Sequence, residues 1–141
     1  MAIPWWGYAL LSALAAAATA ILTKLGVERV PSNLATAVRT TVVLFIAWGL
    51  VAARGEYRSW KDVDHRAVWL LTLSGIATGV SWLAYFRALQ LAPASRVAPI
   101  DKLSLAFTIV LAILVLREPW SWRLVLGAAL IVGGALLTIR G

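Results

Sequence analysis

The sequence predicts an all-α integral membrane protein, a bundle of five transmembrane helices. Five long apolar segments cover most of the 141 residues, 62% of the residues are hydrophobic and only 13% are charged. A helix needs about 20 mostly apolar residues to cross the hydrocarbon core of a bilayer. A soluble protein of this size could not bury five such segments in one core. Lipid is therefore part of the solvent, and helices are expected because they satisfy their own backbone polar groups there.

The five predicted helices are residues 5–23, 34–53, 67–89, 97–116 and 122–139. We expect the first to be a retained helix, since no basic residue precedes it and it exceeds a signal-peptide core of about 7–15 residues. Ser32 or Asn33 is expected to cap the second helix. The third helix follows the most polar loop, residues 54–66. Little sequence lies outside the helices, which predicts a single domain, residues 1–141.

Pro99 is expected in the first turn of the fourth helix, where its missing amide proton costs least. Residues 117–121 then form a turn before the fifth helix.

Several functional classes are made improbable by the composition. Cysteine is absent, which removes disulfides and thiolate chemistry, and there is no zinc spacing, phosphate-binding glycine loop or Ser-His-Asp set. We expect neither an enzyme nor a cofactor. The net charge of +7 would suggest nucleic acid on a soluble protein, but no continuous basic strip or aromatic RNA-binding motif occurs. The cations mostly flank helices, where they meet membrane lipid headgroups.

An odd number of crossings places the two termini on opposite sides of the membrane. The N-terminal side then carries Arg54, Arg58, Lys61, Arg66, Arg117 and Arg123, and the other side carries Lys24, Arg29, Arg87, Arg96, Lys102 and Arg140. Orientation follows an excess of Lys and Arg on the cytoplasmic side, and this balance gives no clear excess. Two interpretations stay open: a modest bias, or dual topology in which two copies pair antiparallel.

Three charged residues within the predicted helices are candidates for a binding site. Arg39 lies about 8 Å into the second helix at 1.5 Å per residue, and Asp101 and Lys102 lie at a similar depth in the fourth. Intramembrane ionisable groups usually face the bundle interior or a wet cavity. We expect Asp101 to pair with Arg39 or Lys102, although a purely structural pair remains an alternative. Lys24 and Arg87, near helix ends, are expected to snorkel to the headgroups.

The third helix adds a possible aromatic wall. Ser81 and Tyr85 are four residues apart and share a face, and Trp82 and Tyr85 are three apart. These side chains either shape a ligand pocket or serve packing alone. Small residues four apart, such as Gly75 and Gly79, favour close helix contacts, and the fifth helix has a similar pattern that suits a dimer seam.

Residues 85–104 read YFRALQLAPASRVAPIDKLS, and Leu116-Arg117-Glu118 and a glycine-rich fifth helix follow. In these features and in residues 33–39 the chain resembles an EamA domain of the drug/metabolite transporter superfamily, over essentially its whole length. The acidic residue usual after the fourth helix is matched by Glu118. The glycine that often precedes it is Arg117 here.

The resemblance implies a secondary transporter of a small organic metabolite in the prokaryotic cytoplasmic membrane. Most relatives carry two such domains in inverted orientation, so a single copy is expected to rebuild the cavity as a homodimer. Small multidrug-resistance proteins resemble a four-helix version, but their acidic residue in helix one is absent here. The expected substrate site is Arg39, Ser81, Trp82, Tyr85, Asp101 and Lys102. Its excess of cations favours an anionic or zwitterionic solute. The alternatives are a non-transporting scaffold subunit and a component of a lipid-carrier flippase.

Overall fold

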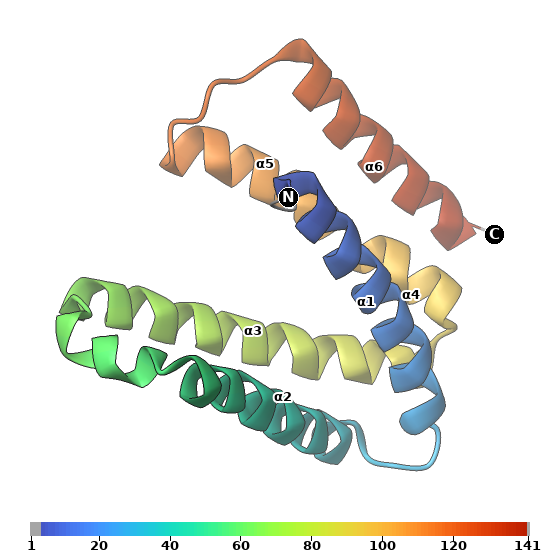
Figure 1. The fold of residues 1–141 in the computed structure, drawn as a ribbon. Helices are drawn as coiled ribbons and strands as arrows, with labels where there is room; N and C mark the ends of the chain where they lie inside the picture. The colour runs from blue at the N-terminus through green and yellow to red at the C-terminus, as the bar shows by residue number, and fades with distance from the viewer. Residues whose placement is uncertain (1–3, 141) are drawn as a thin grey trace. The chain divides into compact units, whose positions relative to one another are not determined.

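The computed structural model describes residues 4–140, apart from the side chain of Arg140. Its regular elements within this range are α1 (Trp5–Gly26), α2 (Ser32–Arg54), the 3-10 helix η1 (Glu56–Asp62), α3 (His65–Leu91), α4 (Ala94–Asp101), α5 (Leu103–Val115) and α6 (Trp122–Arg140) (Figure 1). Five stretches are long and apolar enough to cross a membrane: α1, α2, α3, α4 together with α5, and α6. The predicted all-α, five-span membrane fold is confirmed.

The helices group into two units. One unit, residues 22–90, holds the end of α1, all of α2 and η1, and nearly all of α3. The other, residues 1–21 and 91–141, holds the first part of α1 together with α4, α5 and α6. Within this second unit, α6 contacts both α4 and α5. The expectation of a single domain stays a prediction.

The fourth membrane span departs from the predicted single helix over residues 97–116. It begins earlier, because the Pro93 carbonyl accepts the first helical hydrogen bonds from the amides of Arg96 and Val97. Pro99 is therefore the sixth residue of α4 rather than part of its first turn. A proline in a helix interior removes one hydrogen bond and crowds the carbonyl four residues earlier. The helical span is interrupted three residues later at Lys102, whose ψ is −7°.

Two further expectations about helix ends were wrong. Ser32 is the first residue of α2 rather than its cap, and the N-cap, Pro31, makes no side-chain hydrogen bond. The extended backbone of Pro31 instead lets its carbonyl accept from the amide of Ala35 at 3.0 Å. The predicted loop of residues 54–66 contains η1, which packs against α2. The long helices also run past their predicted ends, because polar residues at the membrane edge can continue a helix.

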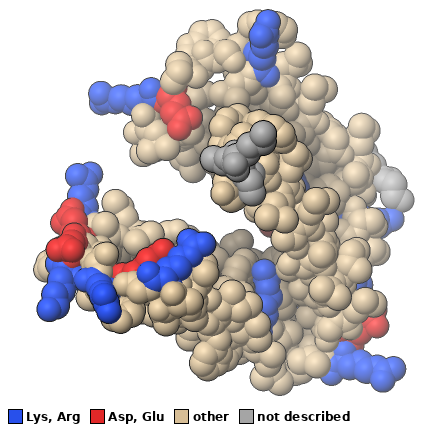
Figure 2. Space-filling view, viewed as in Figure 1, with Lys and Arg blue, Asp and Glu red and all other residues tan. Residues whose placement is uncertain are grey.

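The surface of the chain is largely apolar. On the face seen in Figure 2, neutral atoms dominate and charged side chains form small groups. Phe45 and Ile46 are 72% and 67% exposed within the chain, and Leu137 is 73% exposed. Leaving such side chains in water would cost about 1.5–3 kcal/mol each. Lipid contact removes that cost, which agrees with the five membrane spans.

The buried face of α2 is polar, the opposite of a helix in a soluble protein. Ser32 and Thr36 are buried, whereas the apolar side chains of the same helix face outward. The Thr36 hydroxyl donates to the Ser32 carbonyl at 2.9 Å, and the Thr40 hydroxyl donates to the Thr36 carbonyl at 2.8 Å. Threonine hydroxyls that bond back to the preceding turn carry no unsatisfied donor into a membrane. The hydroxyl groups of this face can therefore lie within the membrane without an unpaired hydrogen-bond donor.

Two turns use left-handed backbone conformations. Gly55 ends α2 with φ +69°, and Arg117 follows α5 with φ +57°. This conformation costs an L-residue with a side chain about 1–2 kcal/mol, and glycine is the usual residue just after a helix for that reason. Arg117 thus occupies a position whose geometry favours glycine.

Replacing Arg117 with glycine is expected to raise the free energy of unfolding by up to about 1 kcal/mol, because relief of the left-handed strain exceeds the extra backbone entropy of glycine. The reverse change, Gly55→Ala, should lower it by about 1 kcal/mol. Unfolding in detergent micelles, followed by circular dichroism, measures both. A less stable Arg117→Gly variant would contradict this account of the turn.

Candidate functional site

A contact between a charged side chain and two aromatic rings lies between α2 and α3. The guanidinium carbon of Arg39 is 4.2 Å from the centre of the Trp82 ring and 5.6 Å from the centre of the Phe86 ring. Trp82 and Phe86 are four residues apart, so their rings project from the same side of α3. A guanidinium over an aromatic face gains about 0.5–2 kcal/mol, more where water is excluded. Arg39 is half-buried in this contact.

Two other predicted site residues belong to the same stretch of α3. Tyr85 is half-buried and lies near enough to interact electrostatically with Arg39. Ser81 is exposed on the chain's surface. The structure therefore brings Arg39, Trp82 and Tyr85 together, and it adds Phe86 to the aromatic contact.

A group of polar contacts ties the end of α3 to the last turn of α1 and the residues that follow it. The Gln90 side-chain amide donates to the carbonyls of Val27 and Val30, at 3.2 and 2.8 Å. Its oxygen accepts from the Arg87 guanidinium at 3.1 Å. The Lys24 ammonium donates to the Leu89 carbonyl at 2.7 Å. The last carbonyls of a helix have no partner within it, and a cation there also complements the helix dipole.

The contact of Lys24 corrects one expectation. Lys24 was expected to snorkel to lipid headgroups, but its ammonium caps the C-terminal end of α3. The Leu89 carbonyl is partly buried near the end of its helix and needs a donor. Sequence position alone does not distinguish the two outcomes, because both place the lysine at the end of a helix.

Asp101 and Lys102 occupy the interruption between α4 and α5. The Lys102 ammonium lies 3.2 Å from a carboxylate oxygen of Asp101, and both side chains are partly exposed. One of the two pairings expected for Asp101 is therefore present. The ion pair joins adjacent residues, and the helix break gives their side chains room to meet.

The predicted six-residue site falls on both units. Arg39, Ser81, Trp82 and Tyr85 belong to residues 22–90, and Asp101 and Lys102 belong to the other unit. The gathering of Arg39 with Asp101 and Lys102 around one cavity stays a prediction. Sequence reasoning missed Phe86 and Gln90. The sequence could have indicated both residues. Phe86 is one helical turn after Trp82, and Gln90 is a lone side-chain amide at the end of a membrane span.

Glycines in the spans face open space. A β-carbon added at Gly75, Gly79, Gly127, Gly133 or Gly134 would meet no atom within 4 Å. On α6 the small residues lie in a shallow hollow of about 630 Å³, lined by Ala129, Leu130, Gly133, Gly134, Leu136 and Leu137. The chain's own packing therefore does not require these glycines.

Comparison with known proteins decides the family. The sequence model described as the EamA-like transporter family matches residues 3–140. The chain belongs to this family. A curated relative from Sinorhizobium sp, named "Uncharacterized transporter in cobO 3'region", is 46% identical over 137 residues, which are 97% of each chain. No solved structure gives a significant match.

Membership of the EamA family and a relative named as a transporter identify a membrane transporter. They agree with the expectation of a protein that is not an enzyme. Among the described residues, no group of three His, Cys, Asp or Glu side chains is placed to hold a metal ion.

Replacing Lys24 with methionine should lower the free energy of unfolding by about 1.5–3 kcal/mol, because a charged donor leaves the Leu89 carbonyl. Arg29→Met is the matched control, since Arg29 is an exposed cation of the following loop. Chemical unfolding in micelles provides the measurement. Equal effects of the two substitutions would show that the cap contributes nothing.

The Arg39–Trp82 contact should appear as a coupling energy of about 0.5–2 kcal/mol in a double-mutant cycle of Arg39→Gln and Trp82→Leu. A second cycle pairs Arg39→Gln with Trp48→Leu, since Trp48 is an exposed tryptophan of the same helix as Arg39. That control should give a coupling near zero. Unfolding free energies of the four proteins in each cycle decide it, and similar coupling in both would contradict a specific contact.

Proposed function

We propose that this protein is a secondary transporter that moves a small anionic or zwitterionic metabolite across the cytoplasmic membrane of a prokaryote. The observation that carries the proposal is the guanidinium of Arg39, within a membrane span and 4.2 Å from the Trp82 ring centre. A cation placed in a membrane span costs a few kcal/mol and marks a substrate or ion pathway. Membership of a transporter family supports the same conclusion.

The contact with Trp82 and Phe86 suits Arg39 to bind an anion. The rings stabilise the cation through its face, whereas its N–H donors lie in the guanidinium plane. That planar fork matches a carboxylate, which it can bind through two parallel hydrogen bonds. A solute with a carboxylate can therefore bind at the edge of Arg39 while the aromatic contact is kept.

The remaining predicted residues complete the proposed site. Trp82 and Tyr85 form its aromatic wall, and Ser81 supplies a hydroxyl for hydrogen bonding. Lys102 adds a second cation, and Asp101 either balances the cations or takes up a proton during transport. Their meeting with Arg39 is part of the proposal.

The proposed working unit is a homodimer, with two copies in antiparallel orientation. The Sinorhizobium relative is covered over 97% of its length, so it too has room for a single repeat. Two-repeat transporters place the site between inverted halves, and two copies of opposite orientation reproduce that plan. The balanced cations on the two sides permit insertion both ways. The open glycines of α3 and α6 allow close helix contact between copies.

Flux into liposomes tests the function. Purified protein is reconstituted and supplied with a radiolabelled panel of amino acids and mono- and dicarboxylates. Arg39→Gln should reduce uptake of the transported solute by about tenfold or more, because a charge-assisted hydrogen bond is lost. Asp101→Asn should also reduce it, and Arg29→Gln, a control outside the spans, should leave it unchanged.

Each outcome separates the alternatives. Flux that is insensitive to both Arg39→Gln and Asp101→Asn would contradict the proposed site. Folded protein that transports no member of the panel would favour a scaffold subunit. A C-terminal reporter labelled from both faces of the membrane would support dual topology, whereas labelling from one face only would contradict the antiparallel dimer.

A further inference from the structure

A hollow of about 470 Å³ lies where η1 leads into α3, away from the proposed transport site. Its volume falls in the range of small-molecule pockets. Its lining consists of Trp60, Lys61, Val63, His65, Val68 and Trp69. Because α2 ends at Arg54 and α3 begins at His65, the hollow sits at the ends of two membrane spans. It therefore lies at the level of the lipid headgroups.

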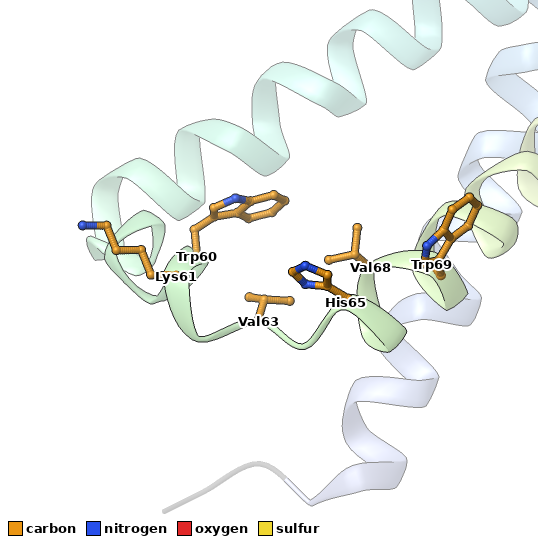
Figure 3. Close-up of a pocket in the computed structure, with 6 residues that line it drawn as sticks. All are labelled: Trp60, Lys61, Val63, His65, Val68 and Trp69. Carbon is orange, nitrogen blue, oxygen red and sulfur yellow. The ribbon is translucent and has the colours of Figure 1, made fainter.

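The apolar side chains of the lining and its one lysine point in different directions. Figure 3 shows the Trp60 ring, Val63, His65 and Val68 around a common space, and Lys61 pointing the opposite way from the Trp60 ring. The Trp60 ring points toward the bodies of the helices, so Lys61 points toward the water side. Trp60 is 64% exposed and Trp69, one turn into α3, is 70% exposed. Indoles so exposed favour the membrane interface, where one edge meets lipid and the N–H meets water or ester oxygens.

The charges around the hollow favour a phosphate. Residues 54–66 carry four Lys or Arg against three Asp or Glu, with His65 in addition. Two of those carboxylates are engaged locally. Glu56 lies 3.8 Å from Arg54, and Asp64 accepts the backbone amide of Arg66 at 3.3 Å, at the start of α3. Lys61 and His65 add an ammonium and an imidazole N–H to the indole N–H donors of Trp60 and Trp69, and such donors suit the oxygens of a phospholipid head.

We propose that this hollow binds one phospholipid of the surrounding bilayer. Lys61 donates a hydrogen bond to its phosphate, and His65, which lies beside the valines (Figure 3), donates to an ester oxygen. Trp60 and Trp69 cover the glycerol and the first methylene groups, with Val63 and Val68 closing the apolar side. The match lies in the order of the groups, because the Lys61 ammonium, the Trp60 indole and the valine side chains follow each other from water toward lipid as phosphate, glycerol and acyl chain do (Figure 3). The lipid holds the segment between α2 and α3 at the membrane surface, and this role does not depend on transport.

The test measures phosphatidylglycerol retained by the purified full chain, using native mass spectrometry during titration of the lipid into detergent. The double variant Lys61→Gln/His65→Gln should bind the lipid about tenfold more weakly, because the charged donor of Lys61 and the imidazole N–H of His65 are both lost. Arg58→Gln is the matched control: it removes a cation of the same 3-10 helix whose guanidinium lies over the Tyr57 ring, outside the hollow. It should change binding less than twofold.

The depth of Trp60 along the bound lipid is tested separately by fluorescence quenching. Phosphatidylglycerol brominated near the ester end of its chains should quench the wild-type protein more than it quenches Trp60→Phe, and bromine at the chain ends should not distinguish them. Weakening of equal size in Arg58→Gln and the double variant would overturn the proposal in favour of general surface charge. Unchanged lipid binding in the double variant would also overturn it. If the double variant does not fold, His65→Gln and Trp60→Phe decide by the same two readouts.

Discussion

The contact between the Arg39 guanidinium and the rings of Trp82 and Phe86 joins α2 to α3 within the unit of residues 22–90. Side chains, rather than close approach of the backbones, connect α2 to α3 at this contact. A cation held in lipid needs a partner, and the aromatic faces supply one without neutralising the charge. Arg39 can therefore stabilise the helix pair and still attract an anion, so stability and the proposed binding chemistry come from one residue.

Lipid as solvent accounts for where polarity is placed. The buried face of α2 carries Ser32 and Thr36, and the outward faces are apolar. Unpaired backbone carbonyls at a helix end cost free energy within the membrane, because no water is there to donate a hydrogen bond to them. Lys24 and Gln90 meet that need at the end of α3 and after α1. The same constraint explains why the polar interruption at Asp101 and Lys102 contains its own ion pair.

The turn after α5 places a residue with a side chain in a conformation that favours glycine. The backbone at Arg117 is left-handed, with φ +57°. The amide of the next residue, Glu118, donates to the Ala112 carbonyl at 3.2 Å. This chain keeps the turn without its usual residue. The connection between the two spans therefore sets the left-handed backbone conformation, and Arg117 adopts it although it has a side chain.

The sequence by itself determined the five membrane spans, because the length of an apolar segment is a local property that must match the thickness of the bilayer. It also singled out Arg39 and Trp82, since a charge and a large ring inside a span are visible without a structure. Only tertiary structure decided that Phe86 joins them, that Lys24 donates to the Leu89 carbonyl near the end of α3, and that the fourth span is interrupted at Lys102. These outcomes depend on which groups from distant segments come within a few ångströms, and on where a helix begins relative to Pro99. Residue spacing along one helix does not contain that information.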